Sequence, residues 1–266
     1  MAKENLSISV VQSQLFWEDT KKNIRHLDGL IQGITNATDL LVLPEMFTTG
    51  FTMKPEIFAA ENGGEGLKWM KFTAKERECV VTGSICVKEN DKFYNRLYWV
   101  KPDGSFSIYD KRHLFRMAKE NEHYTAGEKR ITEEIKGWKI RPLICYDLRF
   151  PVWSRNRWNE NYDAEYDILI YLANWPAVRT YPWKQLLIAR AIENQSYVVG
   201  VNRIGKDGNG IDHSGDSAFI NPRGEVISSL KPNTETVETI SLDGDYLEEF
   251  RKQFPVGNDA DDFELL

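Results

Sequence analysis

Apolar and polar positions alternate along this chain in blocks that predict strands separated by helices. Apolar residues at helical spacing predict helices, which we place at about 19–34, 64–78, 181–194 and 245–254. Short apolar or β-branched runs predict strands, at 6–12, 39–47, 79–87, 92–100, 105–109, 140–144, 167–173, 196–202, 217–220, 225–230 and 234–242. Strands that alternate with helices are typical of an α/β fold.

The segments between these blocks predict turns and loops. Residues 88–91 and 221–224 have hairpin composition, and 205–210 is a glycine-containing loop without the strand–turn–helix context of a phosphate-binding site. Residues 117–137 have many charges and little periodicity, which predicts a long loop that lines a pocket. No linker or repeat interrupts the pattern, so we expect a single domain over 1–266.

Charge and cysteine content narrow the class of protein. The formal net charge of −6 and the scattered lysines and arginines disfavour a nucleic-acid partner. No apolar run approaches the roughly 18 residues that a membrane span needs, and residues 1–6 lack an apolar signal core. We therefore expect a cytoplasmic protein. The acidic tail over 257–266 predicts a solvated terminus.

Three cysteines are present, an odd number without metal-ligand spacing, so the sequence suggests neither a disulfide framework nor a zinc site. Cys79 and Cys86 belong to an apolar run that predicts a buried strand, where a thiol packs as a small hydrophobe. Cys145 differs because it stands where an apolar run stops and Asp147 and Pro151 begin a helix-like segment.

Glu45, Lys111 and Cys145 each lie just past a predicted buried strand. A cysteine at a strand-to-helix turn projects from the sheet edge, beside backbone N–H groups that face whatever it attacks. A carboxylate at the end of a buried strand is either paired or suited to proton transfer. The three together suggest that Cys145 attacks an acyl carbon, Glu45 moves the proton and Lys111 stabilises the oxyanion.

Each of these residues also has a structural interpretation. Cys145 alone is compatible with a buried small hydrophobe, and Glu45 alone with an ordinary loop glutamate. The cations of 111–116 are compatible with a solvated face or an anion site. Within them, His113 is a possible base for a Cys/His pair, although a packing or hydrogen-bonding role is the preferred interpretation.

The chain resembles the nitrilase superfamily of carbon–nitrogen hydrolases over nearly its whole length. The resemblance rests on three motifs in the family's order: Leu43-Pro-Glu45, Tyr109-Asp-Lys111-Arg-His-Leu-Phe, and Ile144-Cys145-Tyr-Asp-Leu-Arg-Phe-Pro151. Three supporting segments follow the same order: Ala173-Asn-Trp-Pro176, Arg190-Ala-Ile-Glu-Asn-Gln195, and Tyr197 to Asn202.

The resemblance implies an α-β-β-α sandwich that pairs into a homodimer or larger homo-oligomer, and an enzyme with no metal or organic cofactor. It implies a Glu45–Lys111–Cys145 triad and a thioester intermediate. It also implies an oxyanion hole made by Lys111 and the backbone N–H of Tyr146. Many members of the family carry a second glutamate in the loop after the lysine motif, and Glu120 fits that position better than Glu122.

Residues 43–51 and 111–117 are similar to the omega-amidase branch, which hydrolyses the terminal amide of α-ketoglutaramate or α-ketosuccinamate. Such a substrate needs a cation for its distal carboxylate and apolar walls around its carbon chain. We expect Arg116 or Arg149 to supply the cation, although a structural salt bridge is an equal interpretation of either residue. The expected walls are Phe47, Met117 and Trp175.

Three alternatives remain open from the sequence. Nitrile hydrolysis uses the same triad, but this chain is short for that branch. N-carbamoyl amino acid hydrolysis also uses the triad, with an arginine for a carboxylate. A non-catalytic binding protein on this fold is disfavoured by the intact Glu45, Lys111 and Cys145.

Overall fold

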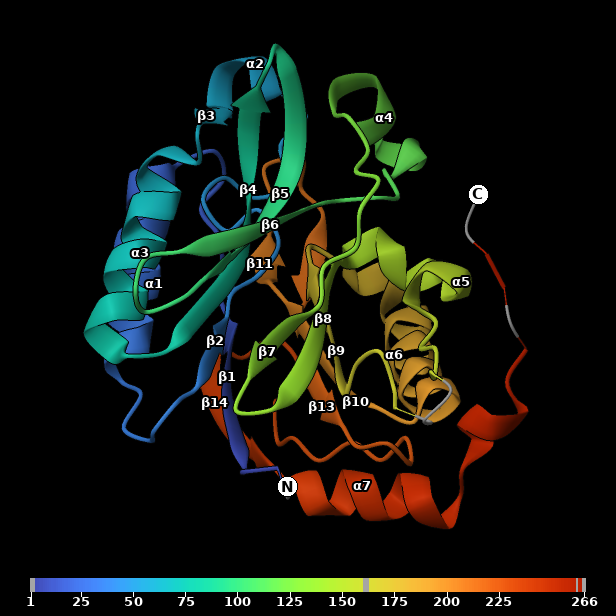
Figure 1. Ribbon diagram of the computed structural model, residues 1–266. Coiled ribbons are helices and arrows are strands. Elements are labelled where there is room, and N and C mark those ends of the chain that lie inside the picture. Colours follow the sequence, from blue (N-terminus) through green and yellow to red (C-terminus); the bar gives the residue numbers. More distant parts are fainter. Residues whose placement is uncertain (1–2, 160–162, 262, 265–266) are drawn as a thin grey trace.

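Two β-sheets pack face to face, and helices cover the outer face of each (Figure 1). The computed structural model describes residues 3–159, 163–261 and 263–264. In Figure 1, α1 and α3 cover one sheet and α5 and α6 cover the other. This arrangement confirms the predicted α-β-β-α sandwich.

The first sheet combines parallel strands at its centre with antiparallel strands at its edges. The pairs β1–β2 and β2–β4 are parallel, whereas β1–β14, β4–β5 and β5–β6 are antiparallel. Its order is β14 (Thr236–Leu242), β1 (Leu6–Gln12), β2 (Leu40–Val42), β4 (Val80–Glu89), β5 (Lys92–Val100) and β6 (Phe106–Asp110), with β3 (Ala60–Glu61) paired to β4.

The second sheet has a parallel centre of β8, β9 and β10 between two antiparallel edges. Its order is β13 (Ala218–Ile220), β10 (Tyr197–Asn202), β9 (Ile168–Ala173), β8 (Trp138–Ile144) and β7 (Glu133–Ile135). A separate hairpin is formed by β11 (Ile204–Lys206) and β12 (Asp212–Ser214).

The long helices form where the apolar spacing predicts them. Leu27 and Ile31 are one helical turn apart in α1 and are buried against the first sheet. The Asp19 side chain caps α1 by accepting a hydrogen bond from the Lys22 N–H at 3.0 Å. The helices are α1 (Thr20–Gln32), α2 (Pro55–Phe58), α3 (Gly64–Arg77), α4 (Glu120–His123), α5 (Pro151–Ser154), α6 (Thr180–Asn194) and α7 (Gly244–Gln253). Single 3-10 turns are η1 (Arg116–Ala118), η2 (Cys145–Arg149), η3 (Ala177–Arg179) and η4 (Val256–Asp259).

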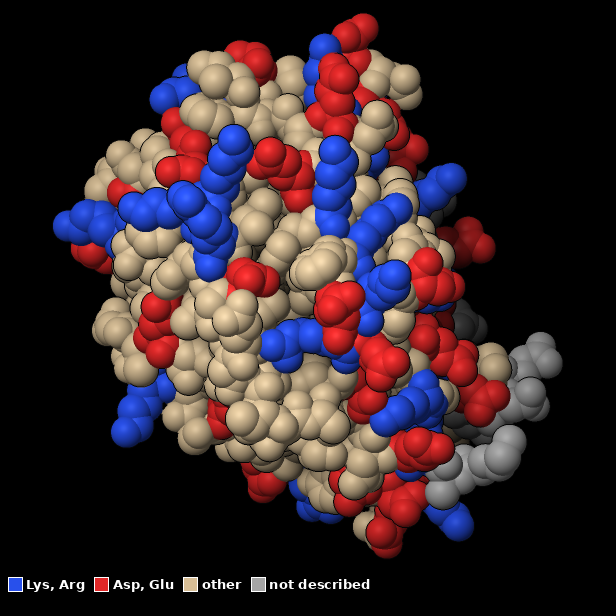
Figure 2. Space-filling model, turned by 90° about the vertical axis from the view of Figure 1, so that its left-hand side faces the viewer, with Lys and Arg blue, Asp and Glu red and all other residues tan. Residues whose placement is uncertain are grey.

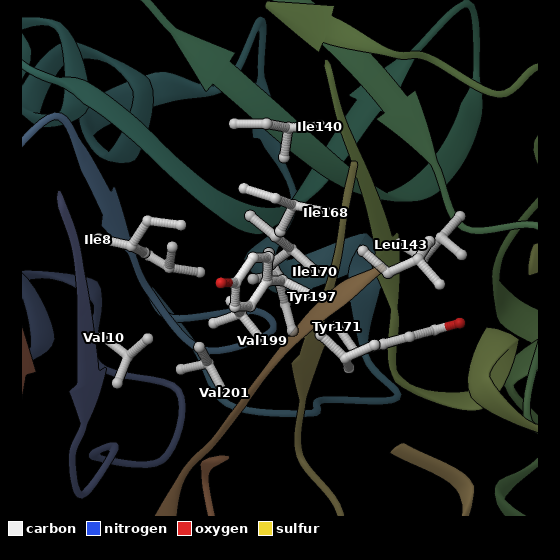
Figure 3. Packing of buried hydrophobic residues seen from close by; sticks show 14 of the residues in the cluster. Ile8, Val10, Ile140, Leu143, Ile168, Ile170, Tyr171, Tyr197, Val199 and Val201 are labelled. Carbon is white, nitrogen blue, oxygen red and sulfur yellow. The ribbon is translucent and has the colours of Figure 1, made fainter. Parts of the chain in front are cut away.

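The main core lies between the two sheets (Figure 3). Ile8 and Val10 of β1 face a set of aliphatic and aromatic side chains from β8, β9 and β10. That set includes Ile140, Ile168, Ile170, Tyr197, Val199 and Val201, all buried. Leu143 and Tyr171 are also buried but point to the opposite face of the second sheet, where the Tyr171 hydroxyl donates to Ser154 Oγ of α5 at 2.7 Å. Each fully buried aliphatic side chain of this size contributes roughly 1.5–3 kcal/mol relative to an exposed one. This packing holds the strand ends of both sheets in fixed positions.

Three segments differ from the sequence prediction. The predicted loop 117–137 contains α4 and β7, two elements too short to leave a periodic pattern. Residues 225–230 do not continue the predicted hairpin, because Val226 forms only an isolated bridge with Ile220. The tail is partly docked, since the Arg157 guanidinium lies over the Phe263 ring, 5.1 Å from its centroid. Residues 262 and 265–266 of that tail are outside the described residues.

Charged side chains of both signs are interspersed on the face that α1 and α3 cover (Figure 2). This distribution agrees with the scattered lysines and arginines of the sequence. Across 3–159, 163–261 and 263–264, none of the helices has the length and apolar character required to cross a bilayer.

Candidate active site

Glu45, Lys111 and Cys145 converge in the structure. They follow β2, β6 and β8, and their side chains are almost completely inaccessible to solvent. The Lys111 Nζ donates to Glu45 Oε1 at 2.9 Å. The Glu45 carboxylate also interacts with the Cys145 thiol. The three strand ends that the sequence singled out therefore form one cluster.

Glu120 completes this cluster from α4. The Lys111 Nζ lies 3.1 Å from Glu120 Oε1 and 3.0 Å from Oε2, and the Phe115 N–H donates to Oε2 at 2.6 Å. Glu122, the alternative considered from spacing, is exposed, and its Oε2 lies 3.8 Å from Lys119 Nζ. Glu120 is thus the loop glutamate that reaches the lysine.

Cys145 is the first residue of η2, directly after β8, and its backbone is strained. Its φ of +43° is in the left-handed region, which typically costs a residue other than glycine about 1–3 kcal/mol. The buried Asp147 carboxylate stabilises this turn by accepting the Ile144 N–H at 3.0 Å. The same carboxylate accepts the Tyr109 hydroxyl at 2.6 Å and the His113 N–H at 3.0 Å. Asp147 therefore ties the cysteine turn to the segment that carries Lys111.

The charges of the cluster perturb one another. Burial alone lowers the pKa of Lys111, but the neighbouring Glu120 and Glu45 carboxylates outweigh it and raise that pKa above its usual value. Burial raises the pKa of Glu120, an effect that the Lys111 ammonium opposes. Burial and the Glu45 charge raise the pKa of the Cys145 thiol well above its usual value. Lys111 thus stays charged, and Cys145 is a neutral thiol at rest that needs a base.

A cavity of about 90 Å³ opens onto the thiol. Besides Cys145, four of the predicted site residues line this cavity: Lys111, Tyr146, Arg149 and Trp175. The remaining lining comes from apolar side chains, from two polar residues after β9 and from the β11–β12 hairpin. These residues are Phe51, Met53, Phe115, Ala118, Asn174, Pro176, Arg179, Asp207, Asn209, Ile211 and His213. Within the described part of the chain, no group of three or more His, Cys, Asp or Glu side chains is arranged to hold a metal ion.

Three predicted substrate-binding residues do not line this cavity. Phe47 packs against Trp69 with ring centroids 5.6 Å apart, in the core between the first sheet and α3. Met117 is 78% exposed and lines a wider hollow of about 700 Å³ outside the cavity. Arg116 is exposed on η1. Phe47 is in the turn after β2, and Arg116 and Met117 are in η1, so closeness in sequence to the motifs does not place these side chains at the thiol.

His113 lies against Asp147 and away from the cavity. Its Nδ1 is 2.8 Å from Asp147 Oδ1, and its ring stacks on Phe150 at a centroid distance of 3.7 Å. It does not belong to the cavity lining. The geometry favours the packing and hydrogen-bonding interpretation over a Cys/His pair.

Several residues at the site were not among the site residues that the sequence analysis proposed. Asn95 of β5 donates to Glu45 Oε1 at 2.8 Å and lies 3.4 Å from Glu120 Oε1. The backbone N–H of Asn174, which follows β9, donates to Glu45 Oε2 at 2.7 Å. Phe51 places its ring centroid 5.0 Å from Lys111 Nζ. Asn174 ends a buried strand as Glu45 does, so the same strand-end argument applies to it.

Two guanidinium groups stand at the cavity wall. Arg149 lies over the Trp175 ring, 5.0 Å from its centroid, and Arg179 lies over the Phe115 ring at 5.3 Å. Among the described residues, neither arginine forms an ion pair with a carboxylate. Both cations are therefore available to an anionic group in the cavity. The sequence analysis considered Arg149 but not Arg179.

The sequence and the fold are similar to those of known hydrolases. The family model for carbon-nitrogen hydrolase matches residues 7–252. The chain is 45% identical to the omega-amidase YafV of Escherichia coli K12, over 98% of each protein. It is 34% identical to the 2-oxoglutaramate amidase of Bacillus subtilis, over 95% of this chain and 96% of that protein. A solved CN-hydrolase superfamily protein from Xanthomonas campestris, with an arsenic adduct in its active site, matches with a TM-score of 0.96 and 40% identity, over 99% of this chain and 100% of the other.

The chain belongs to the carbon-nitrogen hydrolase family, as the family model and the relatives over its full length show. Within the nitrilase superfamily it falls in the omega-amidase-like branch, in agreement with the resemblance of residues 43–51 and 111–117.

Proposed function

We propose that this protein is an omega-amidase, which converts α-ketoglutaramate or α-ketosuccinamate to the α-keto dicarboxylate and ammonia. The observation that carries the proposal is the placement of Cys145 beside Glu45 and Lys111 at a small cavity. Two guanidinium groups that form no ion pair within the described part of the chain line the same cavity. The names of the relatives at 45% and 34% identity support the same activity.

In the first half of the reaction, Cys145 Sγ attacks the amide carbon while its proton passes to Glu45. The carbonyl oxygen becomes an oxyanion, which Lys111 Nζ and the Tyr146 backbone N–H stabilise. Glu45 then returns the proton to the nitrogen, the C–N bond breaks, and ammonia leaves a thioester on Cys145. The raised thiol pKa supports this order, because proton removal has to accompany attack.

In the second half, water replaces ammonia at the thioester carbon. Glu45 takes a proton from the water, the oxyanion forms again beside Lys111, and the C–S bond breaks. The proton returns to sulfur and the carboxylic acid is released. Glu120 keeps the Lys111 ammonium charged and in place throughout, which its two contacts to Nζ support.

The substrate's distal carboxylate binds Arg149, Arg179 or both. A guanidinium suits this role because it offers paired N–H donors to a carboxylate and stacks on aromatic rings, as both arginines do here. Trp175 and Phe115 thus hold the two cations and also wall the cavity beside the substrate's carbon chain.

Ammonia release tests the proposal directly. The panel holds α-ketoglutaramate, α-ketosuccinamate, glutamine, asparagine, an N-carbamoyl amino acid and a simple nitrile, with Cys145→Ala as the blank. Selective turnover of the two α-keto amides is the expected result. Turnover of the carbamoyl compound or the nitrile alone would replace the substrate assignment and leave the cluster's role intact.

We also infer a cytoplasmic homodimer built from single-domain subunits. Three free cysteines support a reducing compartment. The exposed apolar side chains Val152, Tyr181 and Ile192 on α5 and α6 support a contact surface between copies. Light scattering of the purified protein measures the mass, and a monomer at micromolar concentration would contradict the dimer.

A further inference from the structure

Asn95 lies outside the three motifs and contacts Glu45, Glu120 and Lys111. It lies in β5, and its side chain is fully buried. Its amide Nδ2 donates to Glu45 Oε1 at 2.8 Å and lies 3.4 Å from Glu120 Oε1. Its backbone oxygen accepts the Lys111 N–H at 3.0 Å. One residue thus touches both carboxylates and the lysine backbone.

The hydrogen bonds distinguish the two oxygens of Glu45. Oε1 accepts from both Lys111 Nζ, at 2.9 Å, and Asn95 Nδ2, so both of its lone pairs face donors. Oε2 accepts only the Asn174 backbone N–H, at 2.7 Å, among the contacts of the described residues. A proton on Oε1 would displace one of its two donors, whereas Oε2 has a free lone pair that can accept a proton.

The Asn174 backbone N–H is close to both Glu45 Oε2 and the thiol. It donates to Oε2 at 2.7 Å. It also lowers the pKa of the Cys145 thiol, an effect that burial and the Glu45 charge outweigh.

We infer that Asn95 is a positioning residue for the hydrolysis, which holds both carboxylates by their Oε1 atoms and so directs the transferred proton to Glu45 Oε2. This inference rests on the proposed function for its role in turnover. The proton moves from Cys145 Sγ to Oε2 as the S–C bond forms, and from Oε2 to the nitrogen as the C–N bond breaks. An amide suits the position because it donates to two anions without adding charge.

The surroundings of Asn95 and Glu45 define what a pH experiment reports. The titratable groups that face Glu45 are Lys111 after β6, Glu120 of α4 and Cys145 of η2. Asn95→Asp puts a third carboxylate beside Glu45 and Glu120, which makes the carboxylate cluster easier to protonate. Asn95→Leu removes the donor without adding charge. Both variants are expected to move the acid limb of Cys145 reactivity to higher pH, Asn95→Asp further.

Asn156 offers a matched control. It is also buried, and its Nδ2 donates to two backbone oxygens, of Tyr166 at 2.9 Å and of Asn194 at 3.2 Å. Asn156→Asp therefore also adds a buried carboxylate, but not at the cluster.

The experiment measures the pH dependence of Cys145 alkylation by iodoacetamide, followed by mass mapping of the Cys145 peptide, so it needs no substrate. The expected upward shift of the acid limb is about one pH unit or more for Asn95→Asp. No shift is expected for Asn156→Asp. Turnover of α-ketoglutaramate by Asn95→Leu should fall by roughly 10- to 100-fold with little change in KM.

Wild-type alkylation profiles for both Asn95 variants would overturn the inference, as would equal shifts for Asn156→Asp. Circular dichroism establishes that each variant is folded before its profile is read. If the alkylation profile shifts while no α-keto amide is hydrolysed by the wild type, the proposed substrate fails and the role of Asn95 stands.

Discussion

Cys86 and Cys145 are two buried cysteines with raised thiol pKa values, yet their surroundings differ. Cys86 lies in β4, is 0% exposed, and its sulfur is 3.3 Å from the Tyr124 hydroxyl oxygen. Burial raises the pKa of Cys86 to about 12. Burial also raises the pKa of Cys145, but that sulfur has a carboxylate and an ammonium beside it and a cavity in front of it.

The reactivity of a cysteine does not follow from its thiol pKa alone. A low thiol pKa is one route to a reactive cysteine. Neither thiol has it here, because burial disfavours the thiolate at both positions. Reactivity at Cys145 therefore depends on a base, Glu45, that accepts the proton as the bond forms, and on the space for a substrate.

Removal of each cysteine gives the largest expected contrast. Cys145→Ala should lower kcat/KM for α-ketoglutaramate on the order of 10⁶-fold, to the rate without enzyme, because the nucleophile is lost. Cys86→Ala should keep turnover within about 3-fold while it loses about 1–2 kcal/mol of unfolding free energy, since it removes a packed thiol. Steady-state ammonia release and urea unfolding measure the two effects. A dead but folded Cys86→Ala enzyme would break the comparison.

Replacement of the base comes next in size. Glu45→Gln keeps the shape of the side chain but cannot take a proton, so kcat should fall roughly 10²- to 10⁴-fold. His113 contacts Asp147 and not the thiol, so His113→Asn should retain most of the rate. Single-turnover kinetics on the two variants decide between Glu45 and the Cys/His alternative. The opposite ranking of the variants would assign the base to His113.

Substitution of Arg149 and Arg179 tests whether the cavity at Cys145 binds an anionic substrate. Arg179→Met and Arg149→Met should raise KM for α-ketoglutaramate by roughly 10- to 100-fold, because a charge-assisted hydrogen bond to the carboxylate is lost. Hydrolysis of an uncharged aliphatic amide should change little in the same variants. Arg116→Met is the matched control, since Arg116 is exposed outside the cavity. Equal losses on charged and uncharged amides would mean that the two arginines act on the structure instead.

The smallest effect concerns the pH dependence of stability through Cys86. The pKa of the Cys86 thiol is 9.0 when the thiol is exposed, as in the unfolded chain, and about 12 in the folded protein. As the pH rises, the unfolded chain therefore releases the thiol proton at a lower pH than the folded protein. Stability from this group is complete below pH 9 and is lost as the pH rises toward 12, by about 1.4 kcal/mol at pH 10. Urea unfolding at pH 8 and pH 10 should show that the decline is smaller by this amount in Cys86→Ala. Parallel declines in both proteins would contradict it.

The alternation of strands and helices and the three motif residues follow from local pattern, whereas the layered sandwich follows from the family resemblance. Buried apolar runs identify the strands, and Glu45, Lys111 and Cys145 each follow one of them. Because Cys145 follows a strand of the second sheet, the three residues meet only where the two sheets pack together. Glu120 followed from the resemblance and not from periodicity, since α4 is only one turn long. Local pattern thus accounts for the chemistry that sits at strand ends.

Residues placed by tertiary contacts were not predictable in the same way. Asn95 reaches the glutamates because β5 pairs with β4 and β6. The amino-acid sequence alone does not reveal the register of that pairing. Phe47 is two residues from Glu45, yet it points into the core against Trp69. Arg179 follows a strand end by six residues, and η3 turns it to the cavity. Side-chain direction after a motif depends on turns that the apolar pattern does not record.

The most direct test of the central claim is the chemical state of Cys145 during turnover. Wild-type protein is mixed with α-ketoglutaramate, quenched in acid within the first turnover and digested, and the cysteine peptides are weighed by mass spectrometry. The account predicts an acyl group of the α-keto acid in thioester linkage on Cys145 and an unmodified Cys86. Ammonia release without any acyl group on Cys145, or with the acyl group on another residue, would contradict it.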